Sequence, residues 1–234
     1  MGFDLFKRTT DYSSMLNRIA LANFLISLLA CTFLRKEIPG FDRILSKLPE
    51  TGEVMHIKVS LGTILVAGFV AVFCRAIKFH DRISDLFRIR KNFDIAEILI
   101  PMAEQTIGKP LSDEFIARLY QQREGLMSKV FYRYASSSKD KAVIDPHLIE
   151  TALDQWSWFW CLSEAIAVLL VSGIALLAYG EITPAFVLIA IVACCAMLMI
   201  WMRAQCGKNA GSEVAAILDD PERKMKVTEA FRAV

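Results

Sequence analysis

Residues 156–202, WSWFWCLSEAIAVLLVSGIALLAYGEITPAFVLIAIVACCAMLMIWM, decide the fold class of this chain. They form two apolar stretches, 156–179 and 182–202, which are separated only by Gly180 and Glu181. A helix needs about 20 apolar residues to cross the hydrocarbon core of a bilayer, and both stretches have that length. They therefore predict two transmembrane helices joined by a short turn.

Two further apolar stretches, 19–34 and 57–77, precede this pair. The first is short for a span. The second carries Lys58 and Arg75 near its ends, where long side chains reach the lipid headgroups. The sequence therefore predicts an all-α polytopic membrane protein with four transmembrane helices.

The composition agrees with this class. Hydrophobic residues make up 55% of the 234 residues, which exceeds the usual share in soluble domains, and the mean hydropathy is positive. The net charge of +2 is too small to indicate a nucleic-acid partner. The six cysteines lie in or beside the apolar stretches without paired spacing in a polar loop, so we expect them to be reduced packing residues.

The charged segment between the second and third spans is predicted to be helical. Apolar residues continue at a helical period beyond 57–77, so this helix is expected to project past the membrane. Ser112 and two acidic residues predict the start of a second helix, about 112–135, with an apolar stripe. Asp145-Pro146 predicts a third helix start, and no breaker follows before Gly180. The third span is thus expected to extend well out of the bilayer.

Basic residues orient the chain. Arginines and lysines crowd the segment after the second span and follow the fourth span, whereas the turn at 180–183 has none. The positive-inside rule then places residues 78–155 and both termini in the cytoplasm, in a multi-pass inner-membrane protein. The first hairpin does not decide the orientation, because its loop at 35–58 also holds five basic residues. The predicted domains are an N-terminal arm with the first hairpin of spans (1–78), a helical cytoplasmic insert (79–155), the second hairpin (156–203) and a cytoplasmic tail (204–234).

Three tryptophans, Trp156, Trp158 and Trp160, begin the third span. Indole rings favour the headgroup region, which accommodates an apolar body and an N–H donor, so these residues are interpreted as a membrane-interface belt. An aromatic cage or a stacking platform is the alternative, although three positions so close together do not suit a cage.

Glu164 is an ionisable residue inside the third span. Such a residue costs roughly 3 kcal/mol when it is unpaired, so it is expected to face the bundle interior with a partner. Arg75 and Asn23 are predicted at a similar depth, and we expect a buried polar cluster of Glu164, Arg75 and Asn23. The cluster is either a structural contact, with Glu164 paired or protonated, or part of a gate or ion pathway.

Small and polar residues recur at helical spacing along the spans, for example Ser60, Thr63, Ala67 and Ala71 in the second. Such faces let helices approach closely, or they line a pore. Because they occur on several spans, we expect a homo-oligomer.

A basic run follows the second span and contains Arg82, Arg88, Arg90 and Lys91. Its interpretations are contact with anionic lipid and docking of an acidic cytoplasmic protein; direct nucleic-acid binding has no motif behind it.

Enzyme motifs are weak. Arg75 and His80 have the spacing of HEPN ribonucleases, which is a common chance match, and His147 with Glu150 offers two metal ligands that lack a third. The sequence has no Walker loop, nucleophile elbow or zinc-protease motif. We therefore expect a protein without catalytic residues, metal or cofactor.

The span number, the short outer loops and the helical insert between spans two and three resemble the small four-span inner-membrane proteins of bacterial phage-defence loci, such as the membrane subunit of Kiwa-type systems and membrane-perturbing effectors. The resemblance is one of architecture and assigns no residue a role. It implies a membrane component that senses or executes a response by gating a pore or by recruiting a cytoplasmic partner. An ion or small-solute channel or transporter subunit without a defence role is the alternative, and an intramembrane enzyme ranks third.

Overall fold

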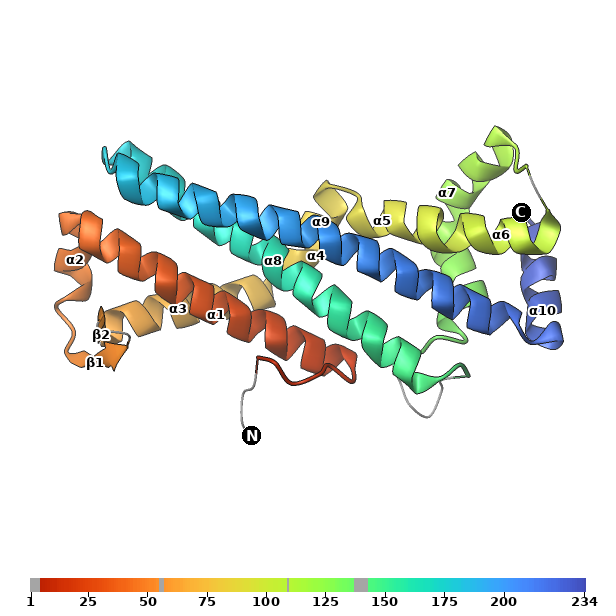
Figure 1. Ribbon diagram of the computed structural model, residues 1–234, viewed down its shortest axis with the longest axis horizontal. Coiled ribbons are helices and arrows are strands. Elements are labelled where there is room, and N and C mark those ends of the chain that lie inside the picture. The colour runs from red at the N-terminus through yellow and green to blue at the C-terminus, as the bar shows by residue number, and fades with distance from the viewer. Residues whose placement is uncertain (1–4, 55–56, 109, 137–142) are drawn as a thin grey trace. The chain divides into compact units, whose positions relative to one another are not determined.

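The computed structural model describes residues 5–54, 57–108, 110–136 and 143–234 (Figure 1). Its elements in chain order are α1 (Tyr12–Glu37), α2 (Pro39–Leu45), β1 (Glu50–Val54), β2 (Ile57–Ser60), α3 (Leu61–Ala76), α4 (Phe79–Leu86), α5 (Ile89–Phe93), the π-helix η1 (Asp94–Leu99), α6 (Ile100–Ile107), α7 (Asp113–Met127), the π-helix η2 (Ser128–Tyr132), α8 (Pro146–Ala178), α9 (Ile182–Leu218) and α10 (Pro221–Arg232). Helices dominate, and the strands of the described residues form one short antiparallel hairpin. The predicted all-α class is confirmed.

Contacts divide the chain into two compact units of nearly equal length. Unit 1 comprises the chain up to Lys7, Leu16–His80 and Ser157–Met202, and unit 2 comprises Arg8–Met15, Asp81–Trp156 and Arg203–Val234. The predicted domains, with limits after residues 78, 155 and 203, were defined by whether each segment crosses the membrane or lies in the cytoplasm. They stay predictions.

Helices α1, α8 and α9 lie along one another in unit 1 (Figure 1). Their shared apolar contact joins residues of all three helices: Ala30, Ile38, Leu169, Leu176, Ala185 and Leu188. Gly180 has a φ of 83°, a conformation that glycine adopts readily, and it ends α8 at the predicted turn. The long third helix predicted from Pro146 onward is also confirmed, since α8 has 33 residues.

Three helices of the described chain, α1, α8 and α9, are long and apolar enough to cross a membrane. A fourth span exists if α3 and α4, which meet at a bend of 57°, act as one. The chain therefore has three candidate spans, or up to four.

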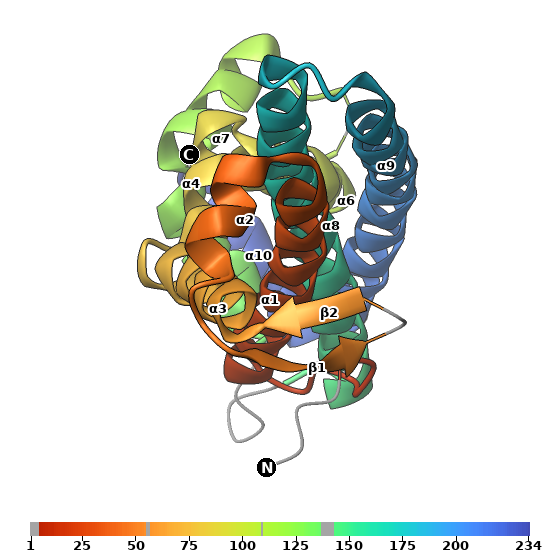
Figure 2. The same ribbon diagram turned by 90° about the vertical axis from the view of Figure 1, so that its left-hand side faces the viewer.

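The second predicted span, 57–77, becomes helical only at Leu61. Residues 57–60 form β2, which pairs with β1, and Figure 2 shows this hairpin at the beginning of α3. The Ser60 hydroxyl accepts a hydrogen bond from the Thr63 amide at 3.2 Å and caps the helix. The 16 residues of α3 measure about 24 Å, less than the hydrocarbon thickness of about 30 Å.

The prediction that this helix continues past the span is wrong. Lys78 has a φ of 50°, in the left-handed region that L residues rarely adopt, and the chain turns there before α4 begins at Phe79. The turn decides which later residues face the rest of unit 1.

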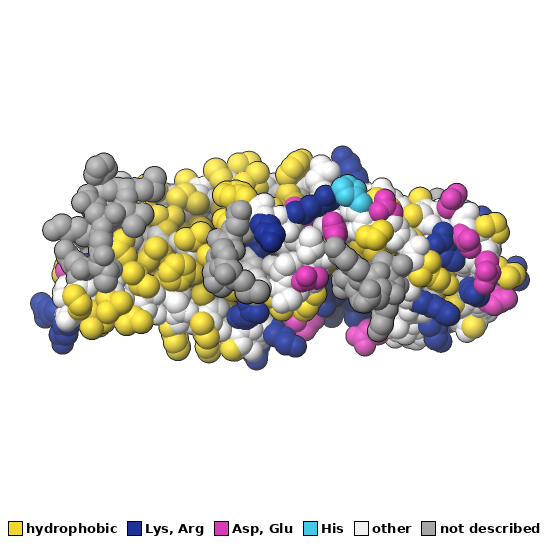
Figure 3. Space-filling model, turned by 90° about the horizontal axis from the view of Figure 1, so that it is seen from below, with side chains coloured by type: hydrophobic (Ala, Val, Ile, Leu, Met, Phe, Trp, Pro, Cys, Tyr) yellow, Lys and Arg dark blue, Asp and Glu magenta, His cyan; other side chains and the backbone are white. Residues whose placement is uncertain are grey.

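Unit 1 buries several polar side chains beside its apolar contact and exposes many large apolar ones. Its buried polar residues include Asn23, His80 and Glu164, whereas Phe69, Ile174 and other large apolar residues of α1, α3, α8 and α9 are exposed. Figure 3 shows hydrophobic side chains gathered mainly over unit 1 and charged ones mainly over unit 2. An apolar exterior around a polar interior suits a unit that is surrounded by lipid.

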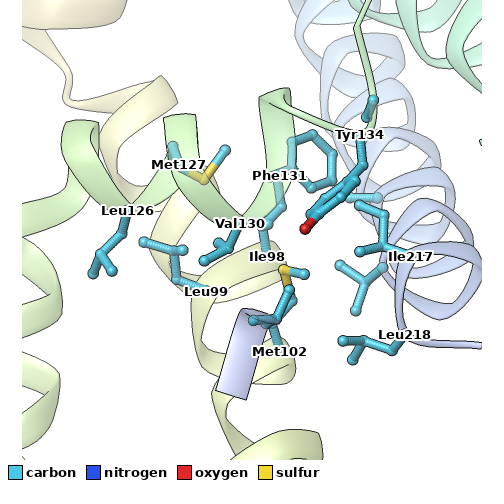
Figure 4. Close-up of a cluster of buried hydrophobic side chains, with 14 of the residues drawn as sticks. Ile98, Leu99, Met102, Leu126, Met127, Val130, Phe131, Tyr134, Ile217 and Leu218 are labelled. Carbon is cyan, nitrogen blue, oxygen red and sulfur yellow. The ribbon is translucent and has the colours of Figure 1, made fainter. Parts of the chain in front are cut away.

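Unit 2 has the opposite arrangement. Its core consists of large apolar residues from η1, α6, α7, η2 and α9, several of which point toward one another in Figure 4. Leu99, Met102, Met127, Val130 and Ile217 are at most 1% exposed. Such a core is typical of a domain that folds in water.

Candidate functional site

The carboxylate of Glu164, on α8, lies at the centre of a polar cluster in unit 1. Glu164 is only 2% exposed. The side-chain amide of Asn23, on α1, donates a hydrogen bond to Oε2 of Glu164. Nδ1 of His80, at the start of α4, lies 3.5 Å from Oε1. The cluster therefore links three helices through one carboxylate.

His80 also lies near the ring of Trp160. It is 3% exposed, and its ring centroid lies 6.1 Å from that of Trp160. Trp160 in turn contacts Phe159 edge to face, with centroids 5.0 Å apart. The imidazole therefore lies near both the carboxylate of Glu164 and the indole of Trp160.

A second polar contact joins α1 and α8. Arg18 is 4% exposed, and its Nη1 donates to Oγ of Ser157 at 2.6 Å. The same guanidinium donates to the carbonyl of Lys7 and lies 5.0 Å from the ring centroid of Trp158. Contacts with the carbonyl, the hydroxyl and the indole compensate the burial of this charge.

These two contacts also give the relative direction of α1 and α8 within unit 1. Arg18 meets Ser157 near the beginning of the contact, and Asn23 meets Glu164 further along both helices. The residue numbers rise together, so α1 and α8 run parallel.

The predicted cluster of Glu164, Asn23 and Arg75 is only partly the one observed. Asn23 contacts Glu164, but Arg75 is exposed, and its Nη1 donates to Oδ1 of Asn17 at 2.7 Å. The expectation that Arg75 belongs to the cluster is corrected to His80. The reason is the turn at Lys78, which brings a residue beyond the end of α3 to the carboxylate. Arg75 is exposed whereas His80 is buried, so the two residues with the ribonuclease-like spacing have different surroundings.

The three tryptophans do not share one environment. Trp160 is 2% exposed and packs inside unit 1, so it does not form the interface belt that was predicted for it. Trp158 lies against Arg18 and Phe6 in unit 1, and Trp156 contacts Phe93 in unit 2 with ring centroids 4.7 Å apart. Successive helix positions are about 100° apart, so alternate residues point in different directions.

The basic run is divided among different partners. Arg90 pairs with Asp81 at 3.3 Å, and the Lys91 ammonium lies 5.7 Å from the centroid of the Tyr120 ring. Arg82 and Arg88 are exposed. A lipid or protein partner can reach the exposed side chains of Arg82 and Arg88.

The stripe of small residues on α3 is an internal packing face. Ser60, Thr63, Ala67 and Ala71 are all at most 6% exposed within the single chain. Close packing was one of the two interpretations of this stripe, and burial supports it. The stripe is thus not open to a second copy, and the motive for expecting an oligomer through Ala67 and Ala71 is lost.

Two buried carboxylates of unit 2 escaped the sequence analysis. Asp94 accepts a hydrogen bond from Nη1 of Arg123 at 2.6 Å; burial raises its pKa, and Arg123 opposes that shift. Burial raises the pKa of Glu213 to about 8. Asp94 and Arg123 are 29 residues apart, and no local pattern pairs them. Glu213 lies on α9 beyond its apolar part, in the segment 204–234 that was predicted to be a cytoplasmic tail.

The residues with possible metal ligands do not converge. Nδ1 of His147 lies 3.3 Å from Nη1 of Arg8 in unit 2. In the described ranges of the chain, no group of three or more His, Cys, Asp or Glu residues is placed to hold a metal ion.

Three helices long and apolar enough to cross a membrane, together with a buried polar cluster, are typical of an α-helical membrane protein. The chain belongs to the YmfE protein family, whose model matches residues 11–232. Searches of curated proteins and of solved structures gave no match.

Proposed function

We propose that this member of the YmfE family is a multi-pass inner-membrane protein that senses or executes a response, with the Glu164 cluster as the contact that controls its membrane unit. The observation that carries the proposal is the burial of Glu164 between Asn23 of α1 and His80 of α4. An ionisable residue within a membrane bundle is costly and marks a functional contact by default. A change in this contact would loosen α1 and α4 from α8, which opens a pore or releases a docking surface.

The parallel direction of α1 and α8 supports four spans. If α1 and α8 both cross the bilayer in the same direction, the chain has to cross back between them. Among the described residues, α3 with α4 is the candidate for that return. Four spans place both termini on one side, and the lysines and arginines that crowd residues 78–91 favour the cytoplasm for that side.

The topology is testable by cysteine labelling in intact cells. Met225, which is exposed in unit 2, and Glu181, in the α8–α9 turn, are each replaced by cysteine. An impermeant maleimide is expected to label E181C, and to label M225C only after the inner membrane is permeabilised. Labelling of M225C in intact cells would contradict a cytoplasmic C-terminus.

The gate is tested with the full-length protein in liposomes that contain a self-quenching dye. Glu164→Gln retains size but removes the ionisable group, and Glu181→Gln is the matched control on a carboxyl group outside the cluster. Because hydrogen bonds to charged groups contribute about 1.5 kcal/mol or more, Glu164→Gln is expected to change the rate of dye release about tenfold. Equal release by the wild type and both variants, with equal incorporation into the liposomes, would contradict a gating role.

The resemblance to phage-defence membrane proteins supports the proposed defence role, with a cytoplasmic protein recruited by unit 2. Cells that carry the gene at its natural locus are expected to lose plating resistance to at least one phage when Glu164 is replaced by Gln. Unchanged plating for both the deletion and E164Q across a phage panel would contradict that role.

A channel or transporter subunit without a defence role is the second candidate. Adjacent buried titratable groups, as in Glu164 and His80, are typical of proton and ion pathways. A steady ion current through the wild-type protein in planar bilayers, together with unchanged phage plating, would favour this candidate. Homo-oligomer formation is also proposed, through the exposed apolar face of α3 that contains Leu65, Phe69 and Phe73. Chemical crosslinking in liposomes that yields only monomer would contradict it.

A further inference from the structure

The turn between α4 and α5 exposes two large apolar side chains in unit 2. Leu86 is 76% exposed and Phe87 is 66% exposed. Among the described residues of unit 2, the next most exposed large apolar residue is Met225, at 56%. Two adjacent side chains that are more exposed than any other described large apolar residue of the unit indicate a contact surface.

The turn is held in place by its neighbours. The Ser84 hydroxyl accepts a hydrogen bond from the Arg90 amide at 3.3 Å, and the Arg90 side chain pairs with Asp81 at 3.3 Å. Arg88 has a φ of 53°, in the left-handed region that is unfavourable for a residue with a side chain. Such conformations persist where the surroundings fix them, and they gather at functional positions. The turn is therefore a built feature that presents Leu86 and Phe87.

Positive charge surrounds the apolar pair. Arg82 and Arg88 are exposed on either side of it, against the single carboxylate of Asp85 between them. A short segment with apolar residues at its tip and arginines around it is typical of chains that lie in the headgroup region of an anionic leaflet. The turn is also close to α3 along the chain, because α4 begins three residues after α3 ends and is only about 12 Å long.

We propose that the tip formed by Leu86 and Phe87 inserts into the anionic leaflet of the membrane that holds the spans, while Arg82 and Arg88 bind lipid phosphates. Lipid fits better than an acidic protein because the short helix α4 alone connects the tip to the turn that ends the apolar helix α3, and because the tip offers bulky apolar side chains together with cations. This proposal rests on the membrane location in the proposed function, but it does not depend on gating by Glu164.

The test places the photo-crosslinking residue p-benzoylphenylalanine at single positions of the full-length protein. The sites are Phe87, Met225 as an exposed control in unit 2, and Ile200 as an exposed control on α9. The protein is reconstituted in vesicles of phosphatidylcholine alone or of an equal mixture with phosphatidylglycerol, and adducts are identified by mass spectrometry. We expect lipid adducts at position 200 in both vesicles, at position 87 mainly in the mixed vesicles, and none at position 225.

Neutralising an exposed arginine of the turn should weaken the insertion. R88Q is expected to lower the adduct yield at position 87 about fivefold in the mixed vesicles, because a basic residue near an anionic surface contributes about 1 kcal/mol. High salt should have the same effect. A yield that is insensitive to both changes would overturn the role of the arginines.

The controls separate the possible failures. Lipid adducts at position 200 without lipid adducts at position 87 overturn the tip proposal alone. Adducts at position 87 with another protein chain overturn it in favour of a protein interface. Lipid adducts at neither position overturn the membrane location itself.

Discussion

Two buried carboxylates, Glu164 in unit 1 and Asp94 in unit 2, are almost equally hidden, at 2% and 3% exposure, but different partners hold them. Glu164 is contacted by an amide and an imidazole from neighbouring helices. Asp94 has a guanidinium at 2.6 Å. A buried carboxyl group needs compensation in both units, but only unit 2 supplies a permanently charged cation for it.

The surroundings account for the difference. All but four of the buried polar residues among the described residues lie in unit 1, and the exceptions are Thr9, Ser84, Asp94 and Glu213. Unit 1 also carries most of the exposed large apolar residues, which would meet lipid. Arg123 of unit 2 keeps part of its guanidinium in water, where the cost of the charge is small. We therefore expect the surroundings of each unit, lipid or water, to determine which polar groups compensate a buried carboxyl group.

The largest expected effect comes from deleting apolar volume in unit 2. Leu99 and Leu169 are both fully buried, one in each unit. Leu99→Ala is expected to lower the free energy of unfolding of unit 2 by about 3 kcal/mol, because burial from water and cavity formation both contribute. Leu169→Ala should cost clearly less, since lipid is as apolar as the helix contact that it loses. Hydrogen exchange of the full-length protein in detergent, resolved by peptide, measures both; equal costs would contradict different solvents.

The second prediction concerns the outer surfaces. Val171, near the centre of the apolar stretch of α8, is 68% exposed, and Met225 in unit 2 is 56% exposed. Lysine near the centre of a membrane helix costs about 3 kcal/mol, so Val171→Lys should sharply reduce the membrane-inserted yield while Met225→Lys leaves it unchanged. Extraction at alkaline pH followed by immunoblotting quantifies inserted protein. Equal yields from both variants would remove the argument that the exposed face of α8 meets lipid.

Length and hydropathy were sufficient to predict the three long apolar helices and the need of Glu164 for a polar partner. The predicted stripe on the helix near 112–135 was also informative, since Leu119, Leu126 and Val130 are buried in unit 2. These features depend on local periodicity, which a single sequence carries.

The partner of Glu164 depended on a different kind of information. A straight helix over 57–77 that continued past the span made Arg75 a reasonable partner for Glu164. In the structure, β2 replaces the first turn of that helix, and the chain turns at Lys78 instead of continuing. The strand pairing was not predicted from the sequence. The positive φ of Lys78 has no sequence signal either, because no glycine or proline marks this position. His80 and Arg18 were missed for the same reason: their burial results from tertiary contacts.

The third prediction concerns the pH dependence of the stability of unit 2, in which Glu213 is buried. The pKa of Glu213 is raised to about 8, so between about pH 5 and pH 8 the folded protein keeps a proton that the unfolded chain releases. The free energy of unfolding of unit 2 should therefore fall as the pH rises through this window, by about 1 kcal/mol per unit at most. Glu213→Gln should flatten this dependence, as measured by hydrogen exchange of residues 206–218. The exposed control Glu222→Gln should keep the wild-type slope.

The central claim is that Asn23 and His80, rather than Arg75, hold Glu164 inside unit 1. Double-mutant cycles test it most directly, with Glu164→Gln combined in turn with Asn23→Leu, His80→Phe and Arg75→Gln. The free energy of unfolding of unit 1 is followed by titrating the full-length protein in mixed micelles with a denaturing detergent. Polar contacts between membrane helices contribute about 1 kcal/mol, so the first two cycles should show a coupling of that size and the Arg75 cycle none within error. A coupling confined to the Arg75 cycle, or none in any cycle, would contradict the account.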